Sequence, residues 1–301
     1  MTLPRDLRHG SLDANGVSLH YVECSAQLAT SIVLLHGFPE DWHMWRFLIP
    51  MVSAFHRVVA VDLRGYGRSS KPRGGQGYDK RTMAEDVHAL VEHLGLVKPL
   101  VVGHDRGARV ARRLALDHPR SVAGVALLDI LPAEWVYDQI TAGEAARKYW
   151  HWVFHLVPGV PEQLVAGREQ EYMRFFFRRT PRVLQDMEAD GTWQEYARAV
   201  TEPGAFEAML EDYRSTFAVD VPRYRAERAA GRRLEVPALL LWGELGNLAG
   251  QPVEEIWMEV ASRVDAAAQL AGCGHYLPEE QPEIVADHVL RFASRCFHPE
   301  G

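Results

Sequence analysis

The residues with the most evident chemical potential lie in the short segment Gly103–Gly107, which reads GHDRG. An apolar run suited to a buried strand, Pro99–Val102, precedes it, and apolar residues at helical spacing follow over Ala108–His118. The two glycines permit a tight, strained turn that larger side chains would not fit. A charged Asp105 on such a turn indicates a carboxylate that is presented for reaction.

Three further groups stand near the ends of strand-like runs. They are Asp129 after Val122–Leu128, the HGFP stretch His36–Pro39 after Ser31–Leu35, and His275 in the glycine-rich loop some thirty residues beyond Ala238–Trp242. Ligands of parallel α/β sheets bind outside the carboxyl ends of the strands, so we expect these groups around one pocket. A nucleophile, an acid and a histidine in this chain order favour nucleophilic hydrolysis.

The elements that must position these groups alternate between strand and helix. The predicted strands are Ser31–Leu35, Arg57–Val61, Pro99–Val102, Val122–Leu128 and Ala238–Trp242, and the predicted helices are Met83–Leu94, Ala108–His118, Val253–Val260 and Ile284–Phe292. Such alternation predicts an α/β fold with a mostly parallel central sheet flanked by helices. Residues 132–224 are instead helical, aromatic and without a clear strand. We therefore expect a core domain of 1–131 and 225–301 with an inserted helical cap of 132–224.

Composition narrows the classes of partner. The chain has 301 residues, is 47% hydrophobic and carries a formal net charge of −7. This charge argues against nucleic acid, and there is no polybasic run or apolar span that would suggest a membrane partner. The three cysteines are scattered, and the N-terminus lacks an apolar signal core. We therefore expect free thiols and a cytoplasmic location.

A metal site is not expected. His151 and His155 are spaced i, i+4, but the segment lacks the glutamate of a metalloprotease motif and no third ligand is apparent.

Taken together, the motifs resemble the α/β-hydrolase superfamily. The shared features are the small-x-nucleophile-x-small turn at 103–107, HGFP, the loop Asp62–Ser69 and the late Gly274-His275. The resemblance covers nearly the whole chain outside the cap. With Asp in place of Ser, the turn is similar to those of haloalkane dehalogenases, epoxide hydrolases and haloacetate dehalogenases. It implies that Asp105 attacks a saturated carbon to form an ester, and that His275 activates the water that hydrolyses it. The backbone N–H groups of Phe38 and Arg106 would then form the oxyanion hole.

The acid that would orient His275 is not at the position usual in the superfamily. Many α/β-hydrolases carry it after the strand that corresponds to Ala238–Trp242, but there this chain has Gly246 where Asp would be expected. Asp129 is the remaining candidate, with Glu244 as its rival. Haloacetate dehalogenases resemble the arrangement with Asp129.

The substrate is suggested by two arginines and three cap residues. Arg106 and Arg109 lie one helical turn apart beside the nucleophile, and paired guanidiniums suit a carboxylate better than a neutral alkyl halide or epoxide. The cap also resembles the fluoroacetate dehalogenase pattern, in which a His, a Trp and a Tyr donate hydrogen bonds to the departing halide. By that resemblance the donors are His151, Trp152 and Tyr213.

The predicted activity is therefore hydrolysis of 2-haloacids such as fluoroacetate or chloroacetate to the 2-hydroxy acid and halide, without a metal or organic cofactor. The resemblance also suggests a homodimer. Two alternatives stay open: an epoxide hydrolase, which shares HGFPE and the Asp nucleophile but uses two cap tyrosines, and a non-catalytic small-ligand receptor of the same fold.

Overall fold

The computed structural model, which describes residues 2–178, 180 and 182–298, is built on one eight-stranded sheet. The strand order is β1-β2-β4-β3-β5-β6-β7-β8. The strands are β1 (Arg8–Ala14), β2 (Val17–Cys24), β3 (Ser31–Leu35), β4 (Arg57–Val61), β5 (Leu100–His104), β6 (Gly124–Leu128), β7 (Ala238–Gly243) and β8 (Ala266–Leu270). β1 and β2 form an antiparallel hairpin that pairs with β4, and all the other pairings are parallel. The predicted fold class is confirmed.

The central strands form where the sequence has short apolar runs. β3 and β4 have the predicted bounds, and every residue of β3, β5 and β6 is buried, as expected of strands covered on both faces. β1, β2 and β8 were not predicted. All the parallel strands end toward the same edge of the sheet, and this edge carries the chemical groups.

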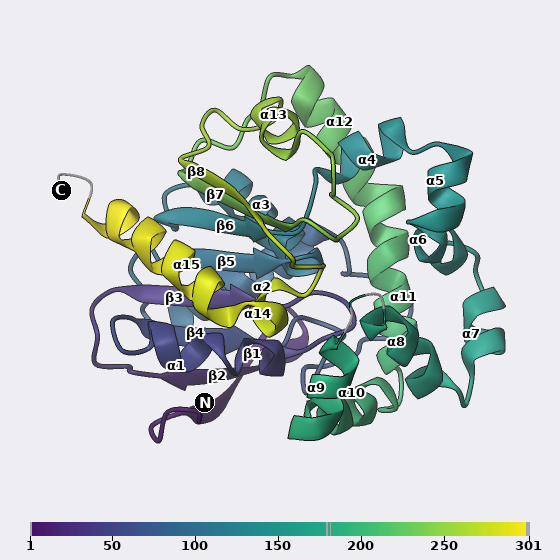
Figure 1. Cartoon of the computed structure of the whole chain (residues 1–301), viewed down its shortest axis with the longest axis horizontal. Coiled ribbons are helices and arrows are strands. Elements are labelled where there is room, and N and C mark those ends of the chain that lie inside the picture. The colour runs from purple at the N-terminus through teal and green to yellow at the C-terminus, as the bar shows by residue number, and fades with distance from the viewer. Residues whose placement is uncertain (1, 179, 181, 299–301) are drawn as a thin grey trace.

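Helices cover both faces of the sheet. α1 (Leu48–Val52) packs against α15 (Pro282–Phe297) on one face, whereas α2 (Lys80–His93) packs against α3 (Arg106–Asp117) on the other (Figure 1). The remaining core helices are a 3₁₀ turn (Trp42–Trp45), α13 (Val253–Met258) and α14 (Leu277–Glu280). α3 follows β5 directly and packs on β3, β5 and β6, so its first turn is fixed against the sheet edge.

The cap lies beyond the carboxyl ends of the parallel strands, on the right of Figure 1. Its helices are α4 (Ala133–Gln139), α5 (Ala142–Arg147), α6 (Trp150–His155), α7 (Val160–Val165), α8 (Glu169–Phe177), α9 (Val183–Asp190), α10 (Thr192–Val200), α11 (Ala205–Ser215), the π-helical turn η2 (Thr216–Asp220) and α12 (Val221–Ala229). Between 132 and 224 the structure contains no strand among the residues it describes, which leave out 179 and 181. The predicted end of the cap at 224 falls inside α12.

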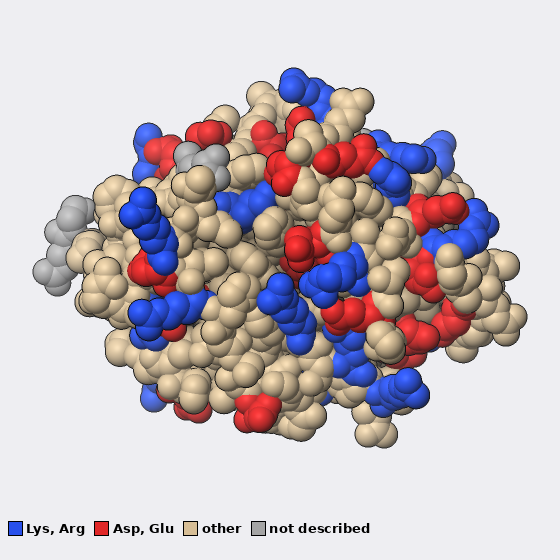
Figure 2. Space-filling view, turned by 90° about the horizontal axis from the view of Figure 1, so that it is seen from below, with Lys and Arg blue, Asp and Glu red and all other residues tan. Residues whose placement is uncertain are grey.

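Charge is spread over the surface without a dominant sign on the face shown in Figure 2, where basic and acidic side chains intermingle. No helix within the described part of the chain is both long and apolar enough to cross a bilayer.

Candidate active site

Asp105 stands between the end of β5 and the start of α3 in a strained backbone conformation, with φ 46° and ψ −113°. Such angles are costly for a residue with a side chain and persist only where the surroundings enforce them. The neighbouring glycines show why they are needed. A Cβ at Gly107 would lie 2.2 Å from the Leu35 carbonyl oxygen, and one at Gly103 would lie 2.6 Å from the Ala108 Cα. The turn therefore requires glycine on both sides of the carboxylate.

The HGFP stretch packs directly against this carboxylate. The Phe38 N–H donates to Asp105 Oδ1 at 3.2 Å, and a Cβ at Gly37 would lie 2.6 Å from the Asp105 Cβ. Arg106 is the first residue of α3, so its N–H has no acceptor within the helix. These two N–H groups stand where the sequence predicts the oxyanion hole.

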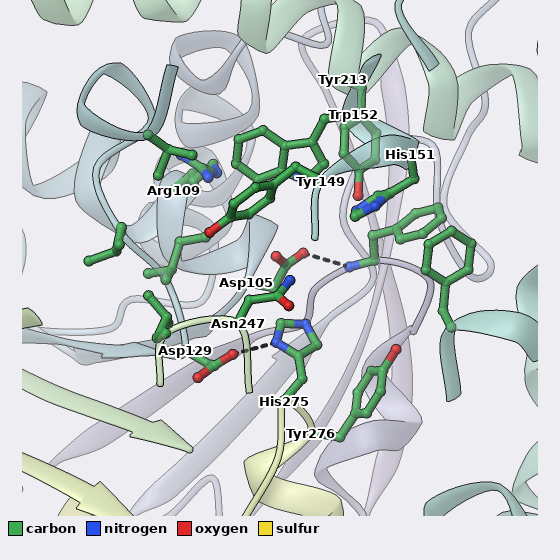
Figure 3. Close-up of a pocket in the computed structure, with 16 residues that line it drawn as sticks. Asp105, Arg109, Asp129, Tyr149, His151, Trp152, Tyr213, Asn247, His275 and Tyr276 are labelled. Carbon is green, nitrogen blue, oxygen red and sulfur yellow. Dashed lines mark hydrogen bonds and ion pairs between the residues drawn. The ribbon is translucent and has the colours of Figure 1, made fainter. Parts of the chain in front are cut away.

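Asp129 holds the histidine. It follows β6 with φ 47°, its Oδ2 lies 2.6 Å from His275 Nδ1, and its Oδ1 accepts the Gly243 N–H at 3.1 Å. A proton on Nδ1 makes this hydrogen bond, which leaves Nε2 available as a base. Figure 3 shows His275 between Asp129 and Asp105.

Asp129 and Glu244, the two candidates for the acid role, differ in their hydrogen-bond partners. Glu244 accepts the N–H of Gly272 at 2.8 Å instead of approaching the imidazole. Gly246, where an acid was expected, backs onto the Asp129 carboxylate, since a Cβ there would lie 3.4 Å and 3.5 Å from its two oxygens. Asp129 thus occupies the place that an acid at 246 would reach.

Positive charge surrounds Asp105, the predicted nucleophile. Burial alone would raise the pKa of Asp105, but the nearby charges of His275, His104, Arg106 and Arg109 outweigh it and hold this pKa below its ordinary value. Behind the strand end, His104 Nδ1 lies 3.2 Å from Glu40 Oε2. Although burial opposes the charged imidazole, this carboxylate raises the pKa of His104 to about 9. Asp105 is therefore ionised, as a nucleophile must be.

The two arginines predicted to bind substrate differ in their surroundings. The Arg106 guanidinium donates to the Asp212 carboxylate at 2.5 Å and 2.6 Å and to the Thr216 hydroxyl at 2.6 Å. Lys80 pairs with the same carboxylate, and the Tyr66 hydroxyl donates to it at 2.8 Å. We call Lys80, Tyr66, Arg106 and Asp212 the buried ion cluster. Arg106 is not among the residues that line the pocket. Its guanidinium is bonded to the Asp212 carboxylate, so it is not placed to bind a substrate carboxylate as the sequence predicted.

Arg109, one turn later, lines the pocket. It is 4% exposed, and within the described residues its Nε and Nη2 have no hydrogen-bond partner. Its guanidinium carbon lies 5.2 Å from the centre of the Trp152 ring. Burial and then the charge of Arg106 lower its pKa. A buried guanidinium without a matching anion is energetically costly unless a ligand supplies one.

The cap closes the other side of the pocket. His151 and Trp152 of α6 and Tyr213 of α11 all line it, as the sequence predicts (Figure 3). Tyr149 and Asn247 line it too and were not predicted, because a lone tyrosine or asparagine carries no motif. The cavity measures about 40 Å³. A water needs roughly 10–15 Å³, so about three waters would fill it.

One set of potential metal ligands exists among the described residues, away from this pocket. Glu85 and His88 of α2 meet His118 at the end of α3. The two imidazoles stack with centroids 3.8 Å apart and planes 15° apart. Nitrogen lone pairs lie in the plane of each ring, so rings stacked in this way do not point both lone pairs at one ion. His155 Nε2, for its part, is hydrogen-bonded to the Tyr172 hydroxyl at 2.6 Å.

Known proteins resemble this chain over nearly its whole length. A soluble epoxide hydrolase from Corynebacterium sp. (strain C12) is 34% identical over 300 residues, covering 95% of this chain and 97% of the relative. A fluoroacetate dehalogenase from Burkholderia sp. is 33% identical over 272 residues, covering 88% and 87%. A mutant of a Pseudomonas aeruginosa protein, provisionally described as an epoxide hydrolase and solved with bound MFA, is 33% identical with a TM-score of 0.90, covering 99% of both chains.

A family model described as the alpha/beta hydrolase fold matches residues 30–280. This span begins just before β3 and ends with α14, so it includes the strained carboxylate, its acid–histidine pair and the whole cap. The chain belongs to the α/β-hydrolase family and is a hydrolase.

Proposed function

We propose that this hydrolase removes halide from small 2-haloacids, converting them to 2-hydroxy acids. The observation that carries the proposal is Arg109, a buried guanidinium beside Asp105 whose Nε and Nη2 lack a hydrogen-bond partner among the described residues. A substrate carboxylate would supply the missing anion and could accept both N–H groups at once. A neutral epoxide or alkyl halide would leave the charge unmatched.

In the first half-reaction Arg109 holds the substrate carboxylate and aligns its α-carbon with Asp105. Because Phe38 binds Oδ1, Oδ2 is the attacking oxygen. Its electron pair forms the C–O bond from the face opposite the halide, which leaves with the electrons of the C–X bond and inverts the carbon. His151, Trp152 and Tyr213 donate hydrogen bonds to the developing halide charge, which matters most for fluoride because it is a poor leaving group.

In the second half-reaction His275 Nε2 takes a proton from water, and the hydroxide attacks the ester carbonyl of Asp105. The N–H groups of Phe38 and Arg106 stabilise the oxyanion on Oδ1. Asp129 orients the imidazole and stabilises its charged form. Collapse of the intermediate expels the 2-hydroxy acid, which takes the proton from His275 and leaves Asp105 free. The balance is haloacid plus water to hydroxy acid, halide and a proton.

Pocket size supports a small substrate. A cavity of about 40 Å³, room for about three waters, suits a two-carbon haloacid. The fluoroacetate dehalogenase of Burkholderia, 33% identical, is a relative with this chemistry.

Epoxide hydrolysis is the second candidate, and one observation favours it. Tyr149 and Tyr213 both line the pocket, so two phenols are present where two would protonate an epoxide oxygen. The Corynebacterium relative is named for this activity.

Initial rates with fluoro-, chloro- and bromoacetate, read by a halide-selective electrode, and with styrene oxide, read as diol, separate the two. We expect halide release and no diol. Diol formation without halide release would assign the epoxide activity instead.

The His275→Ala variant tests whether the protein turns substrate over or only binds it. It should release one halide per site and accumulate a covalent ester at Asp105, seen as a mass increase. An absence of adduct with every haloacid and epoxide would favour a small-ligand receptor. Homodimer formation stays a prediction, which sedimentation velocity would test.

A further inference from the structure

The proposed base, His275, does not lie on a helix or a strand. It occupies the loop between β8 and α14, where regular backbone hydrogen bonding does not hold the chain. A general base must keep its position relative to the water it activates to within roughly 0.5 Å. Something else must therefore hold this loop.

Glu280, the last residue of α14, supplies that support. Its Oε2 accepts the N–H of Gly274 at 2.6 Å, and its Oε1 accepts the N–H of Tyr276 at 2.8 Å. These are the residues immediately before and after His275, so one carboxylate holds the backbone on both sides of the imidazole. Hydrogen bonds from N–H groups to a carboxylate are about twice as strong as neutral ones.

The rest of the loop is adapted to this contact. A Cβ at Gly274 would lie 2.5 Å from the Thr180 hydroxyl oxygen and 3.1 Å from Glu280 Oε1, so only glycine fits there. The carbonyl oxygen of His275 accepts from His104 Nε2 at 2.8 Å, on the side of the nucleophile. His104 at the strand end holds this carbonyl, and Glu280 holds the flanking amides. The backbone that carries the imidazole is therefore fixed in position.

We propose that Glu280 is a positioning residue for His275 and controls the hydrolysis half-reaction alone. It does not line the pocket that contains Asp105. Loss of the two hydrogen bonds that its carboxylate accepts should leave displacement of halide intact and slow the attack of water on the ester. The inference rests on the proposed function only in requiring an ester at Asp105, an intermediate that both candidate activities share.

The test is Glu280→Gln, which keeps the volume but replaces one accepting oxygen with a donor facing an N–H. Enzyme in excess over bromoacetate is followed by rapid quench, with halide read for the first step and ester mass on Asp105 for the second. We expect the rate of halide release to be unchanged. Ester decay should slow about 10- to 100-fold, which is the cost of a small misplacement of a catalytic group. Glu280→Asp, too short to reach both amides, should show the same division if the Gln variant folds poorly.

Glu283→Gln is the matched control, because this exposed residue makes the same charge change three positions along and should alter neither step. Equal slowing of both steps by the Glu280 variants, or ester decay at the wild-type rate, would overturn the proposal. If the wild type releases no halide from any haloacid, the proposed function fails, and the same ester decay is then measured with styrene oxide.

Discussion

The first turn of α3 places two arginines in opposite situations. Arg106 lies in the buried ion cluster, where its guanidinium bonds to Asp212 and a second cation, Lys80, shares that carboxylate. Arg109 lies near Asp105 and lines a small cavity, but its Nε and Nη2 have no hydrogen-bond acceptor among the described residues. Both are almost fully buried, at 2% and 4% exposed, so burial does not distinguish them. A hydrogen-bonded carboxylate therefore distinguishes the cation that joins core to cap from Arg109, the cation that we propose binds substrate.

Tyr213 forms the boundary between the two regions. The Arg106 guanidinium carbon lies 3.8 Å from the centre of its ring, while the same side chain lines the cavity. Asp212 precedes it on α11, so the ion cluster also fixes the cap helix that carries this wall of the pocket. Stability of the cap and geometry of the pocket thus meet at one residue.

The largest expected effect comes from removing the anion of the cluster. Asp212→Asn keeps the shape but removes the carboxylate that both Lys80 and Arg106 contact, so the free energy of unfolding should fall by about 3–5 kcal/mol. Urea unfolding measures this, with the exposed Glu207→Gln on the same helix as control. A variant as stable as the wild type would show that the cluster does not join cap to core.

Arg109→Met should separate function from stability. The kcat/KM for chloroacetate should fall at least about 100-fold, because the substrate carboxylate loses its buried partner. The free energy of unfolding should change little, since the lost attraction to Asp105 is offset by removal of a buried cation whose Nε and Nη2 make no hydrogen bond among the described residues. Kinetics and urea unfolding on one preparation test both expectations, with the exposed Arg120→Met as control. A stability loss like that of Asp212→Asn would place the two arginines in one class.

Tyr213→Phe removes the hydroxyl but keeps the ring beside Arg106. We expect the first half-reaction with fluoroacetate to slow at least about tenfold, because a hydrogen bond to a charged group is worth roughly 1.5–3 kcal/mol. The loss should be smaller with bromoacetate, whose leaving group needs less help. Rapid-quench halide release with both substrates checks this. Equal losses would mean that the hydroxyl does not contact the halide.

The smallest effect concerns pH. Because positive neighbours hold the pKa of Asp105 below its ordinary value, the carboxylate stays ionised as pH falls, and the halide burst should persist below the range of an ordinary aspartate. Removing one of these charges in Arg109→Met should move the acid limb of the profile to higher pH. Rates of halide release across the acid range give the acid limb of the pH profile for the wild type and for the variant. If the two limbs coincide, Arg109 does not contribute to the low pKa of Asp105.

The elements that can be predicted from the sequence are those encoded by neighbouring residues. β3 and β4 are continuous apolar runs and have the predicted bounds, whereas β8 reads AAAQL, with little β propensity, and β1 is an edge strand with mostly polar, exposed residues. The strained turn of Asp105 is encoded by its own glycines, so it could be predicted.

Non-local contacts could not be predicted in this way. Arg106 meets an anion 106 positions away, on a helix whose packing no local pattern reveals. Glu280 acts through backbone amides, which every residue except proline possesses, so its partners leave no mark in the residue types.

Gly246 has a consequence for how such sites can change over evolutionary time. Its backbone lies close enough to the Asp129 carboxylate that an acidic side chain grown there would enter the same space. An acid can therefore serve one histidine from the end of either β6 or β7. A lineage could exchange Asp129 for an aspartate at 246 in two substitutions while His275 stays where it is. The acid of the proposed triad is better described as a place for a negative charge beside His275 than as a fixed position in the chain.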